Sequence, residues 1–386
     1  MLFSEKYFEL KAQFNPAAIK TGFIGSGISC HAFPFKSSYP ADALKIPQSP
    51  AVSNNLLFAV PDEAIMENQS FTYYIFTPGT KTKYKKAILL LHGLNERNWD
   101  KYLVWAYYLA EKTGHPVILF PIAFHMNRSP EAWGNPRIMQ PLMELRKQNF
   151  GNNPVSTFAN VALSERLTDE PLRFFTSGQQ SAADIAKLIR QVNLGEHPLF
   201  EIKATVDVFA YSIGAFLAQI LFLANPGGLF SKAKLFLFCG GAFFNEMNGV
   251  SKLIMDQVAF RRLRSFYIDE LNQECIGLEP LVDAMNKTTT GQAFRAMLAP
   301  ALMQTFRETR FRKIIHNIQA ITLTNDKVIP ASNTACALGA GAHVETLDFP
   351  FAYSHEAPFP ISNRALFPLV DKAFEQVFSK AARFLG

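Results

Sequence analysis

The chain alternates short apolar runs with longer segments in which apolar residues recur at helical spacing. Six of the runs are predicted to be strands, and several of these are almost continuously apolar, which is typical of central parallel strands that helices cover on both faces. The six runs span residues 71–77, 87–91, 116–121, 204–210, 233–239 and 318–324. A seventh run, 343–349, is more mixed in character and is also predicted to be a strand.

Helical patterns lie between these runs and after them. They span residues 102–113, 181–192, 215–224 and 367–384. In the last segment, Val370, Phe374 and Phe378 follow one another four positions apart, which places them on one face of a helix. Strands that alternate with helices predict an α/β fold with a mostly parallel sheet.

Two long segments interrupt the alternation. Residues 123–180 are rich in Asn, Pro and Arg, and residues 245–312 have a mainly helical pattern. Long inserts in a compact domain are usually caps or lids that shape a binding pocket. We therefore predict an α/β domain over residues 71–386, with an insertion at about 123–180 and a helical lid at about 245–312. Residues 1–70 are predicted to be an N-terminal extension that wraps the core.

The composition is that of a folded globular protein, since 48% of the 386 residues are hydrophobic and 18% are charged. The formal net charge is +6, and the basic residues are dispersed except for clusters at 81–86 and 261–264. Neither cluster lies among aromatic side chains on which bases stack, so we do not expect a nucleic-acid partner.

The four cysteines, Cys30, Cys239, Cys275 and Cys336, are far apart and lack the spacing of a metal site. We expect reduced thiols and no bound metal. The N-terminus carries acidic residues where a secretory signal needs a basic start and an apolar stretch. No apolar run reaches the length of a transmembrane helix, so the sequence favours a cytoplasmic protein without a membrane span.

The segment from Val208 to Gly214 joins a predicted strand to a predicted helix through a serine with small neighbours. This is the pattern of a nucleophile elbow, a sharp turn that exposes a serine hydroxyl. Ala210 stands where glycine is usual in such a turn. We favour Ser212 as a catalytic nucleophile over the alternative, a serine in an ordinary strand–helix junction.

A glycine turn, His92-Gly93, follows the second apolar run of the chain. Gly93 allows the backbone to turn so that amides point at a developing oxyanion, and the expected donors are the amides of Leu94 and Ile213. His92, Gly93 and Asn95 are expected to form the oxyanion loop close to the substrate. The alternative is a simple strand-end turn with a structural histidine.

An acid and a base follow later strands. Asp326 comes directly after the sixth apolar run, at a strand end where catalytic acids collect. Asp348 and Asp371 are rivals, but the first lies within a strand pattern and the second on the last helix. His355 lies in the loop before that helix and is the expected base. His343 begins the last strand, away from the catalytic side, and the alternative for His355 is a surface-loop histidine.

The order Ser212, Asp326, His355, with the glycine turn upstream, resembles the α/β-hydrolase superfamily. The resemblance implies an eight-stranded, mostly parallel sheet flanked by helices, and a serine hydrolase that needs no cofactor or metal. In such an enzyme His355 takes the proton of Ser212, which forms an acyl-enzyme, and Asp326 orients the histidine.

The expected reaction is hydrolysis of a carboxylic ester, as in carboxylesterases and lipases. Apolar side chains of the inserts favour a small-molecule ester with an apolar acyl or aromatic group, although such side chains are more often core: Phe124, Met126, Trp133, Phe243, Phe244, Met247, Phe260 and Phe266. His125, Arg128 and Arg137 are candidates to contact a substrate carboxylate, or are solvated loop cations. The alternative functions are an acyltransferase and a non-catalytic binding protein that keeps the fold.

Overall fold

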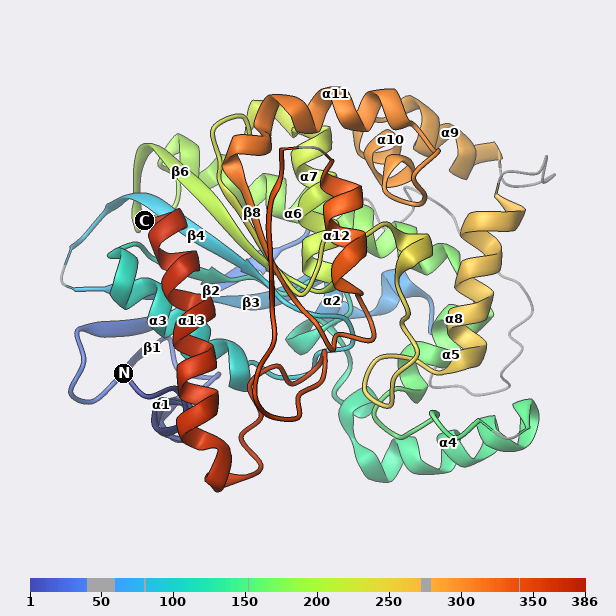
Figure 1. Ribbon diagram of the computed structural model, residues 1–386, viewed down its shortest axis with the longest axis horizontal. Helices are drawn as coiled ribbons and strands as arrows, with labels where there is room; N and C mark the ends of the chain where they lie inside the picture. Colours follow the sequence, from blue (N-terminus) through green and yellow to red (C-terminus); the bar gives the residue numbers. More distant parts are fainter. Residues whose placement is uncertain (40–59, 80, 152, 272–278, 340) are drawn as a thin grey trace.

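The computed structural model describes residues 1–39, 60–79, 81–151, 153–271, 279–339 and 341–386, and a nine-stranded sheet lies at its centre (Figure 1). In spatial order the strands are β1 (Lys20–Gly22), β2 (Ile28–Lys36), β3 (Ser70–Pro78), β5 (Val117–Leu119), β4 (Tyr84–Leu91), β6 (Phe200–Tyr211), β7 (Leu235–Phe238), β8 (Ile318–Leu323) and β9 (His343–Leu347). The strands from β5 to the β9 edge are mutually parallel, whereas β1–β2, β2–β3 and β3–β5 are antiparallel pairs.

This is the α/β-hydrolase fold that the resemblance implies, and the predicted mostly parallel sheet flanked by helices is confirmed. All seven strands predicted from apolar runs are present. The sheet has nine strands rather than eight because residues 1–70 contribute β1 and β2, which the sequence did not reveal. β2 owes its conformation to pairing with β3 along its whole length. It contains Pro34, which lies beyond Ser29–His31, the stretch of β2 that pairs with β1, so a missing amide hydrogen is tolerated on the outer side of the strand there.

Helices surround the sheet. The α-helices are α1 (Phe3–Gln13), α2 (Met66–Gln69), α3 (Asp100–Thr113), α4 (Pro136–Phe150), α5 (Val161–Asp169), α6 (Leu172–Leu194), α7 (Ile213–Ala224), α8 (Gln257–Arg264), α9 (Glu279–Lys287), α10 (Thr289–Ala296), α11 (Gln304–Ile314), α12 (Ala331–Leu338) and α13 (Phe367–Leu385). Short 3-10 turns occur at Asp62–Ala64, Met126–Arg128, Glu131–Gly134, Pro226–Gly228, Phe244–Glu246, Ile315–Asn317 and Arg364–Leu366, and a π-helical turn at Ser265–Glu270. In the described part of the chain, no helix is both long and apolar enough to cross a membrane.

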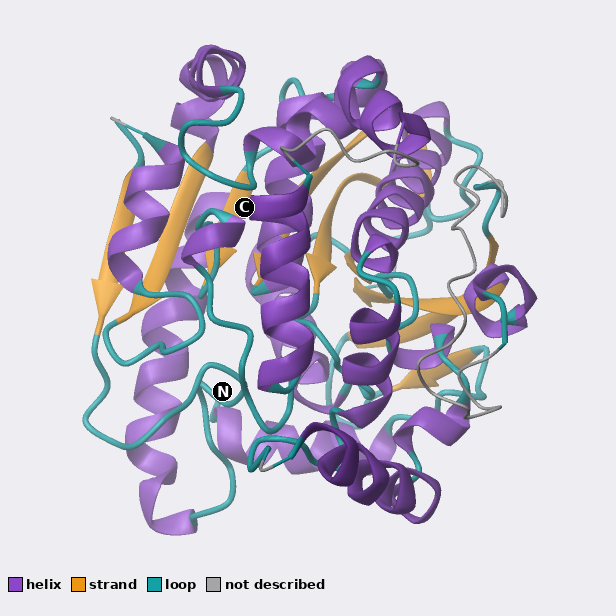
Figure 2. Ribbon diagram, turned by 90° about the vertical axis from the view of Figure 1, so that its right-hand side faces the viewer, coloured by secondary structure: helices purple, strands orange, loops and turns teal. Residues whose placement is uncertain are grey.

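The two faces of the sheet carry separate hydrophobic clusters. Along β6, Phe209 and Tyr211 face the cluster that contains α1, α3 and α13, whereas Val208 and Ala210 face the cluster that contains α6 and α7. This alternation follows from the two-residue period of a strand. Figure 2 shows the helices on both sides of the strands. The near-continuous apolar runs of the sequence are therefore strands with two buried faces.

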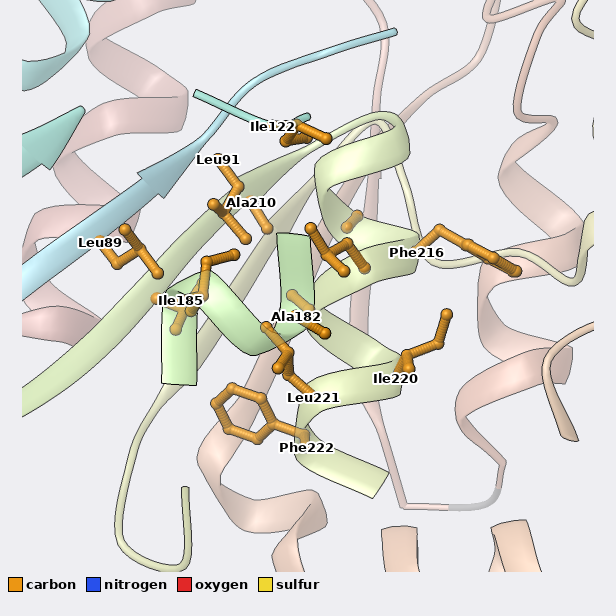
Figure 3. Packing of buried hydrophobic residues seen from close by; sticks show 14 of the residues in the cluster. Leu89, Leu91, Ile122, Ala182, Ile185, Ala210, Phe216, Ile220, Leu221 and Phe222 are labelled. Atoms are coloured by element: carbon orange, nitrogen blue, oxygen red, sulfur yellow. The ribbon is translucent and has the colours of Figure 1, made fainter. Parts of the chain in front are cut away.

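The helix that follows Ser212 packs closely on the sheet. Figure 3 shows α6 and α7 against the ends of β4 and β6, with Ala182 and Ala210 among the buried side chains. Two alanines at this contact let the helices approach the strands. Phe216 and Leu221 of α7 fill the space farther from the turn. The packing fixes the direction in which α7 leaves the strand.

The two predicted inserts meet each other. Their helices α4, α5 and α8 lie together on one side of the molecule, away from both chain termini (Figure 1). The buried guanidinium of Arg146 in α4 binds Asp256, which caps α8, at 2.5 Å, and Glu165 in α5 at 3.2 Å. α6 begins at Leu172, within the range 123–180, and α10 and α11 pack on α7. One arginine thus joins helices of both inserts.

Candidate active site

The structure brings Ser212, His355 and Asp326 together in one hydrogen-bonded chain. The Ser212 hydroxyl lies 2.7 Å from Nε2 of His355, and Nδ1 of His355 lies 2.8 Å from Oδ2 of Asp326. An ionised carboxylate only accepts hydrogen bonds, so Nδ1 carries the imidazole proton and Nε2 is free to accept from the serine. All three side chains are buried.

The turn at Ser212 has the geometry of a tight elbow. Its φ of 57° and ψ of −123° are unusual for a residue with a side chain, and surrounding structure must hold them. A Cβ at Gly214 would lie 2.8 Å from the carbonyl oxygens of Leu91 and His92, and one at Gly240 would lie 2.3 Å from Cβ of Ala215. The helix can therefore start directly against the end of β4 only because both positions are glycine.

Ala210 does not disturb the elbow. It lies in the regular part of β6, where it pairs with Leu91 on one side and Leu237 on the other. Its backbone does not have a positive φ. The departure from glycine at this position is accommodated because the strand, and not the turn, includes residue 210.

Asp326 is held by the loop that follows β8. Its Oδ1 accepts hydrogen bonds from the amides of Val328 and Ile329, both at 2.9 Å, which leaves Oδ2 for His355. The two rivals bind elsewhere. Asp348 accepts from the Tyr353 hydroxyl at 2.9 Å, and the Asp371 carboxylate accepts from the amide and hydroxyl of Ser4 near the N-terminus.

The loop that carries His355 is fixed from two sides. The Tyr211 hydroxyl donates to the carbonyl oxygen of His355, and the two rings stack with centroids 5.5 Å apart. The Ser251 hydroxyl donates to the carboxylate of the next residue, Glu356. Burial opposes ionisation of this carboxyl most strongly, but hydrogen bonds from Ser251, the Glu356 amide and Ser354 together outweigh it and lower the pKa of Glu356. The second predicted insert therefore contacts the histidine loop directly.

Lys101 connects the histidine loop to the glycine turn at Gly93. Its ammonium donates to the Glu356 carbonyl at 2.9 Å and forms a 2.5 Å ion pair with Glu96. The Tyr102 hydroxyl donates to the same Glu96 carboxylate at 3.0 Å and accepts from the Gly93 amide at 2.9 Å. Two consecutive residues at the start of α3 thus set the position of both loops.

His92 is built into the loop and is not available for proton transfer. Its Nδ1 lies 2.8 Å from the Gly93 carbonyl, and its Nε2 accepts from the Ile122 amide at 2.9 Å. Burial, reinforced by the nearby His125, holds the pKa of His92 well below its usual range, so the ring is neutral. The structure agrees with a structural histidine at this position.

The expected oxyanion donors lie on either side of the serine turn. Among the described residues no acceptor binds the amide of Leu94 or of Ile213. Asn95 has a left-handed φ of 60°, and its amide group donates to the carbonyls of Ala159 and Leu253, each at 2.8 Å. Asn95 therefore attaches the oxyanion turn to both inserts, and its amide hydrogens are used in doing so.

The remaining candidates for contact with a substrate carboxylate lie in the first predicted insert. His125 is buried, Arg128 forms a buried 2.9 Å ion pair with Asp184, and Arg137 is exposed on α4. The apolar side chains of the inserts that were weighed as pocket or core all pack in or against the hydrophobic clusters. In the described ranges, no group of three or more His, Cys, Asp or Glu side chains is placed to hold a metal ion.

Sequence reasoning did not identify Lys101, Tyr102 or Tyr211 as parts of this site. Tyr102 lies in a predicted helix, Lys101 directly before it and Tyr211 in the predicted elbow, and none of the three was assigned a role there. Lys101 and Tyr211 act on the loop of His355, which is distant in sequence. Lys101 lies shortly after the glycine turn and at the start of a buried helix, where a charged residue needs a partner. This position was the one signal in the sequence that pointed to its role.

Solved structures similar to this chain include esterases at low identity. A cold-adapted esterase from an Arctic intertidal metagenomic library has 8% identity and a TM-score of 0.43, with 97% of this chain and 100% of that chain covered. A carboxyl esterase of Bacillus coagulans has 13% identity and a TM-score of 0.42, with coverages of 92% and 99%. Carboxyl esterase 2 of Tuber melanosporum has 10% identity and a TM-score of 0.43, with coverages of 81% and 80%.

Sequence comparisons give a family without an activity. A search of curated protein sequences found no match. The model of a protein family described as a family of unknown function, DUF6051, matches residues 1–386. With its whole length matched, the chain belongs to the DUF6051 family.

Proposed function

We propose that the protein is a serine hydrolase that cleaves a carboxylic ester through an acyl-enzyme on Ser212. The observation that carries the proposal is the hydrogen-bonded chain from Ser212 through His355 to Asp326. Each member follows a different strand or loop at the same end of the sheet, where catalytic groups of α/β folds collect. Such a chain is the arrangement that activates a serine hydroxyl.

In the first half of the reaction, Ser212 Oγ attacks the ester carbonyl and its proton moves to Nε2 of His355. Asp326 keeps the ring in the required tautomer and stabilises the imidazolium, while its own Oδ1 stays bound to two backbone amides. The imidazolium then gives the proton to the leaving alcohol. The product of this half is an acyl group on Ser212.

The negative charge on the carbonyl oxygen requires donors in place before the attack. We assign this role to the amides of Leu94 and Ile213, which no acceptor of the described residues occupies. The amide of Ile213 lies at the start of α7, where helix amides have no partner within the helix. Each such donor contributes about 3 kcal/mol to the transition state.

In the second half, water attacks the acyl group while His355 accepts its proton. The same oxyanion donors act again, and the acid product leaves with Ser212 restored. The firm attachment of the His355 loop by Tyr211 and Lys101 suits a base that acts twice without moving.

The test uses the purified chain with p-nitrophenyl acetate and a fluorophosphonate probe. We expect turnover and labelling of the wild-type protein, and loss of both in Ser212→Ala. Ser332→Ala removes an exposed serine hydroxyl and serves as the control. A wild-type protein that the probe does not label contradicts the proposal. Product analysis with an added alcohol acceptor shows whether the acyl group passes to water or to the alcohol.

A further inference from the structure

Arg97 is a cation without an anionic partner next to the proposed oxyanion turn. Its guanidinium contacts only neutral oxygens, Oδ1 of Asn95 at 2.8 Å and Oγ of Ser129 at 3.1 Å. Its Nε is buried and has no hydrogen-bond partner, although the residue as a whole is partly exposed. No carboxylate of the described residues forms an ion pair with it.

Other buried arginines of the chain have partners that compensate for the cost of burying their charge. Arg128 and Arg146 each bind a buried aspartate, at 2.9 Å and 2.5 Å. Arg307 has no carboxylate, but its two terminal nitrogens donate to three backbone carbonyls at 2.7 to 3.0 Å. A buried cation normally has such partners because desolvation is costly. Arg97 is different, because its guanidinium donates to two neutral side-chain oxygens and to no carboxylate or backbone carbonyl.

The surroundings of Arg97 add positive charge. Arg166 lies close enough that, after burial, its charge helps to lower the pKa of Arg97 to about 10. Arg166 also has an unpartnered buried nitrogen, NH1, and it shares its one carboxylate, Asp62, with Arg173. Arg173 also pairs with Asp169 and interacts with Glu170. These carboxylates pair with Arg166 and Arg173, and none of them forms an ion pair with Arg97.

The histidine nearest to this cluster does not offset the charge. Burial, together with the cations Arg97 and Arg128, lowers the pKa of His125 to about 4, so its ring is neutral near pH 7. Its Nε2 is buried and unpartnered. His125 therefore adds no positive charge of its own beside Arg97.

Arg97 is close in sequence to Leu94, whose amide is a proposed oxyanion donor. It is three residues after Leu94, so their Cα atoms are at most about 11 Å apart. Asn95 turns the backbone between them and binds both the Arg97 guanidinium and the inserts. These hydrogen bonds fix the position of the guanidinium relative to the Leu94 amide, the proposed oxyanion donor.

We infer that Arg97 binds a carboxylate of the substrate, so that the ester cleaved at Ser212 carries a second, ionised carboxyl group. The inference rests on the proposed function for the reaction, but the binding step itself is independent of turnover. A carboxylate at Arg97 supplies the missing anion and occupies the free Nε. Arginine suits this task because its planar fork matches a carboxylate.

Binding to the full chain with Ser212→Ala tests the inference without turnover. The probes are monomethyl glutarate, with the carboxylate in the acyl part, O-acetylglycolate, with the carboxylate in the alcohol part, and dimethyl glutarate, which is neutral. We expect calorimetry to show at least tenfold tighter binding of one anionic probe than of the neutral one. Adding Arg97→Gln should abolish this difference, and adding Arg97→Lys should retain part of it.

Arg190→Gln removes an exposed arginine of α6 and should leave all three affinities unchanged. Equal binding of anionic and neutral probes overturns the inference. The inference is also overturned if the Arg97→Gln variant, shown to be folded by circular dichroism, binds all three probes more weakly by the same factor. That result is expected of an arginine whose role is purely structural. If the anionic preference depends on Arg97 while p-nitrophenyl esters are not cleaved, the carboxylate site stands and the hydrolase proposal fails.

Discussion

The side chain of Tyr211 holds the backbone of His355, because its hydroxyl donates to the histidine carbonyl and its ring stacks on the imidazole. Tyr211 directly precedes Ser212, the candidate nucleophile. The same short segment at the end of β6 therefore positions both partners of the proposed proton transfer. The distance from serine to histidine depends on one strand end more than on the long loop between β9 and α13.

Tyr211→Phe should lower kcat with little change in KM. The variant keeps the stacked ring and loses one hydrogen bond, which is worth about 1 kcal/mol, or about fivefold in rate. Steady-state kinetics on a p-nitrophenyl ester measure the effect. Tyr84→Phe is the control, since its hydroxyl also donates to a backbone carbonyl, that of Pro78 at 2.6 Å, but far from the site. Equal losses in both variants would contradict a local role for Tyr211.

Gly240→Ala should damage the elbow. The new Cβ would lie 2.3 Å from Cβ of Ala215 and 3.2 Å from the Ser212 carbonyl, so the turn must move. Overpacking of this kind costs about 1–3 kcal/mol of folding free energy. We expect a lower free energy of unfolding in urea and a lower kcat.

Gly178→Ala is the matched change in α6, where a new Cβ meets nothing within 4 Å. It should raise the free energy of unfolding by about 0.5–1 kcal/mol, since alanine is the better helix former. The two variants should therefore change stability in opposite directions. A Gly240→Ala protein as stable and active as the wild type would disprove the close packing described for the elbow.

Arg146→Met should destabilise the contact between the two inserts. It leaves Asp256 buried without its cation, a loss that costs about 3–5 kcal/mol. The double variant with Asp256→Asn should recover part of that cost, because the fully buried charge at residue 256 is then gone and only the partly buried Glu165 still lacks its cation. Urea unfolding of the single and double variants gives the comparison. A double variant less stable than Arg146→Met alone would contradict this explanation.

Acid should destabilise the protein through His125. Its folded pKa of about 4 lies below the unfolded value of about 6.5, so the unfolded chain binds more protons as the pH falls between these values. The stabilisation is complete above pH 6.5 and declines by about 3 kcal/mol as the pH drops to about 4. Unfolding free energies of His125→Asn measured from pH 7 to 4.5 should vary less with pH than those of the wild type. His343→Gln, at an exposed site, should behave like the wild type.

The central strands and the serine turn could be predicted because local sequence determines them. A strand buried on both faces, such as β6, must be apolar at nearly every position, and the helix after Ser212 needs Gly214 to pack. The positions of Asp326 and His355 relative to Ser212 followed from the rule that parallel strands end at one edge of the sheet.

What could not be predicted depends on contacts between distant segments. β2 is a strand because β3 pairs with it, and its own pattern is irregular and contains a proline. Lys101 is 255 positions from Glu356, and nothing near either residue indicates that they meet. The neutrality of His92 results from complete burial and from a bond to Ile122, which only the folded chain supplies.

The side-chain amide of Asn95 has one further consequence. Its two hydrogens bind Ala159 in one insert and Leu253 in the other, while its backbone continues the turn from Leu94. Swinging either insert outward breaks one of these bonds and releases the turn that presents the Leu94 amide. In the proposed mechanism, the Leu94 amide is therefore held in place only while both inserts keep their hydrogen bonds to Asn95.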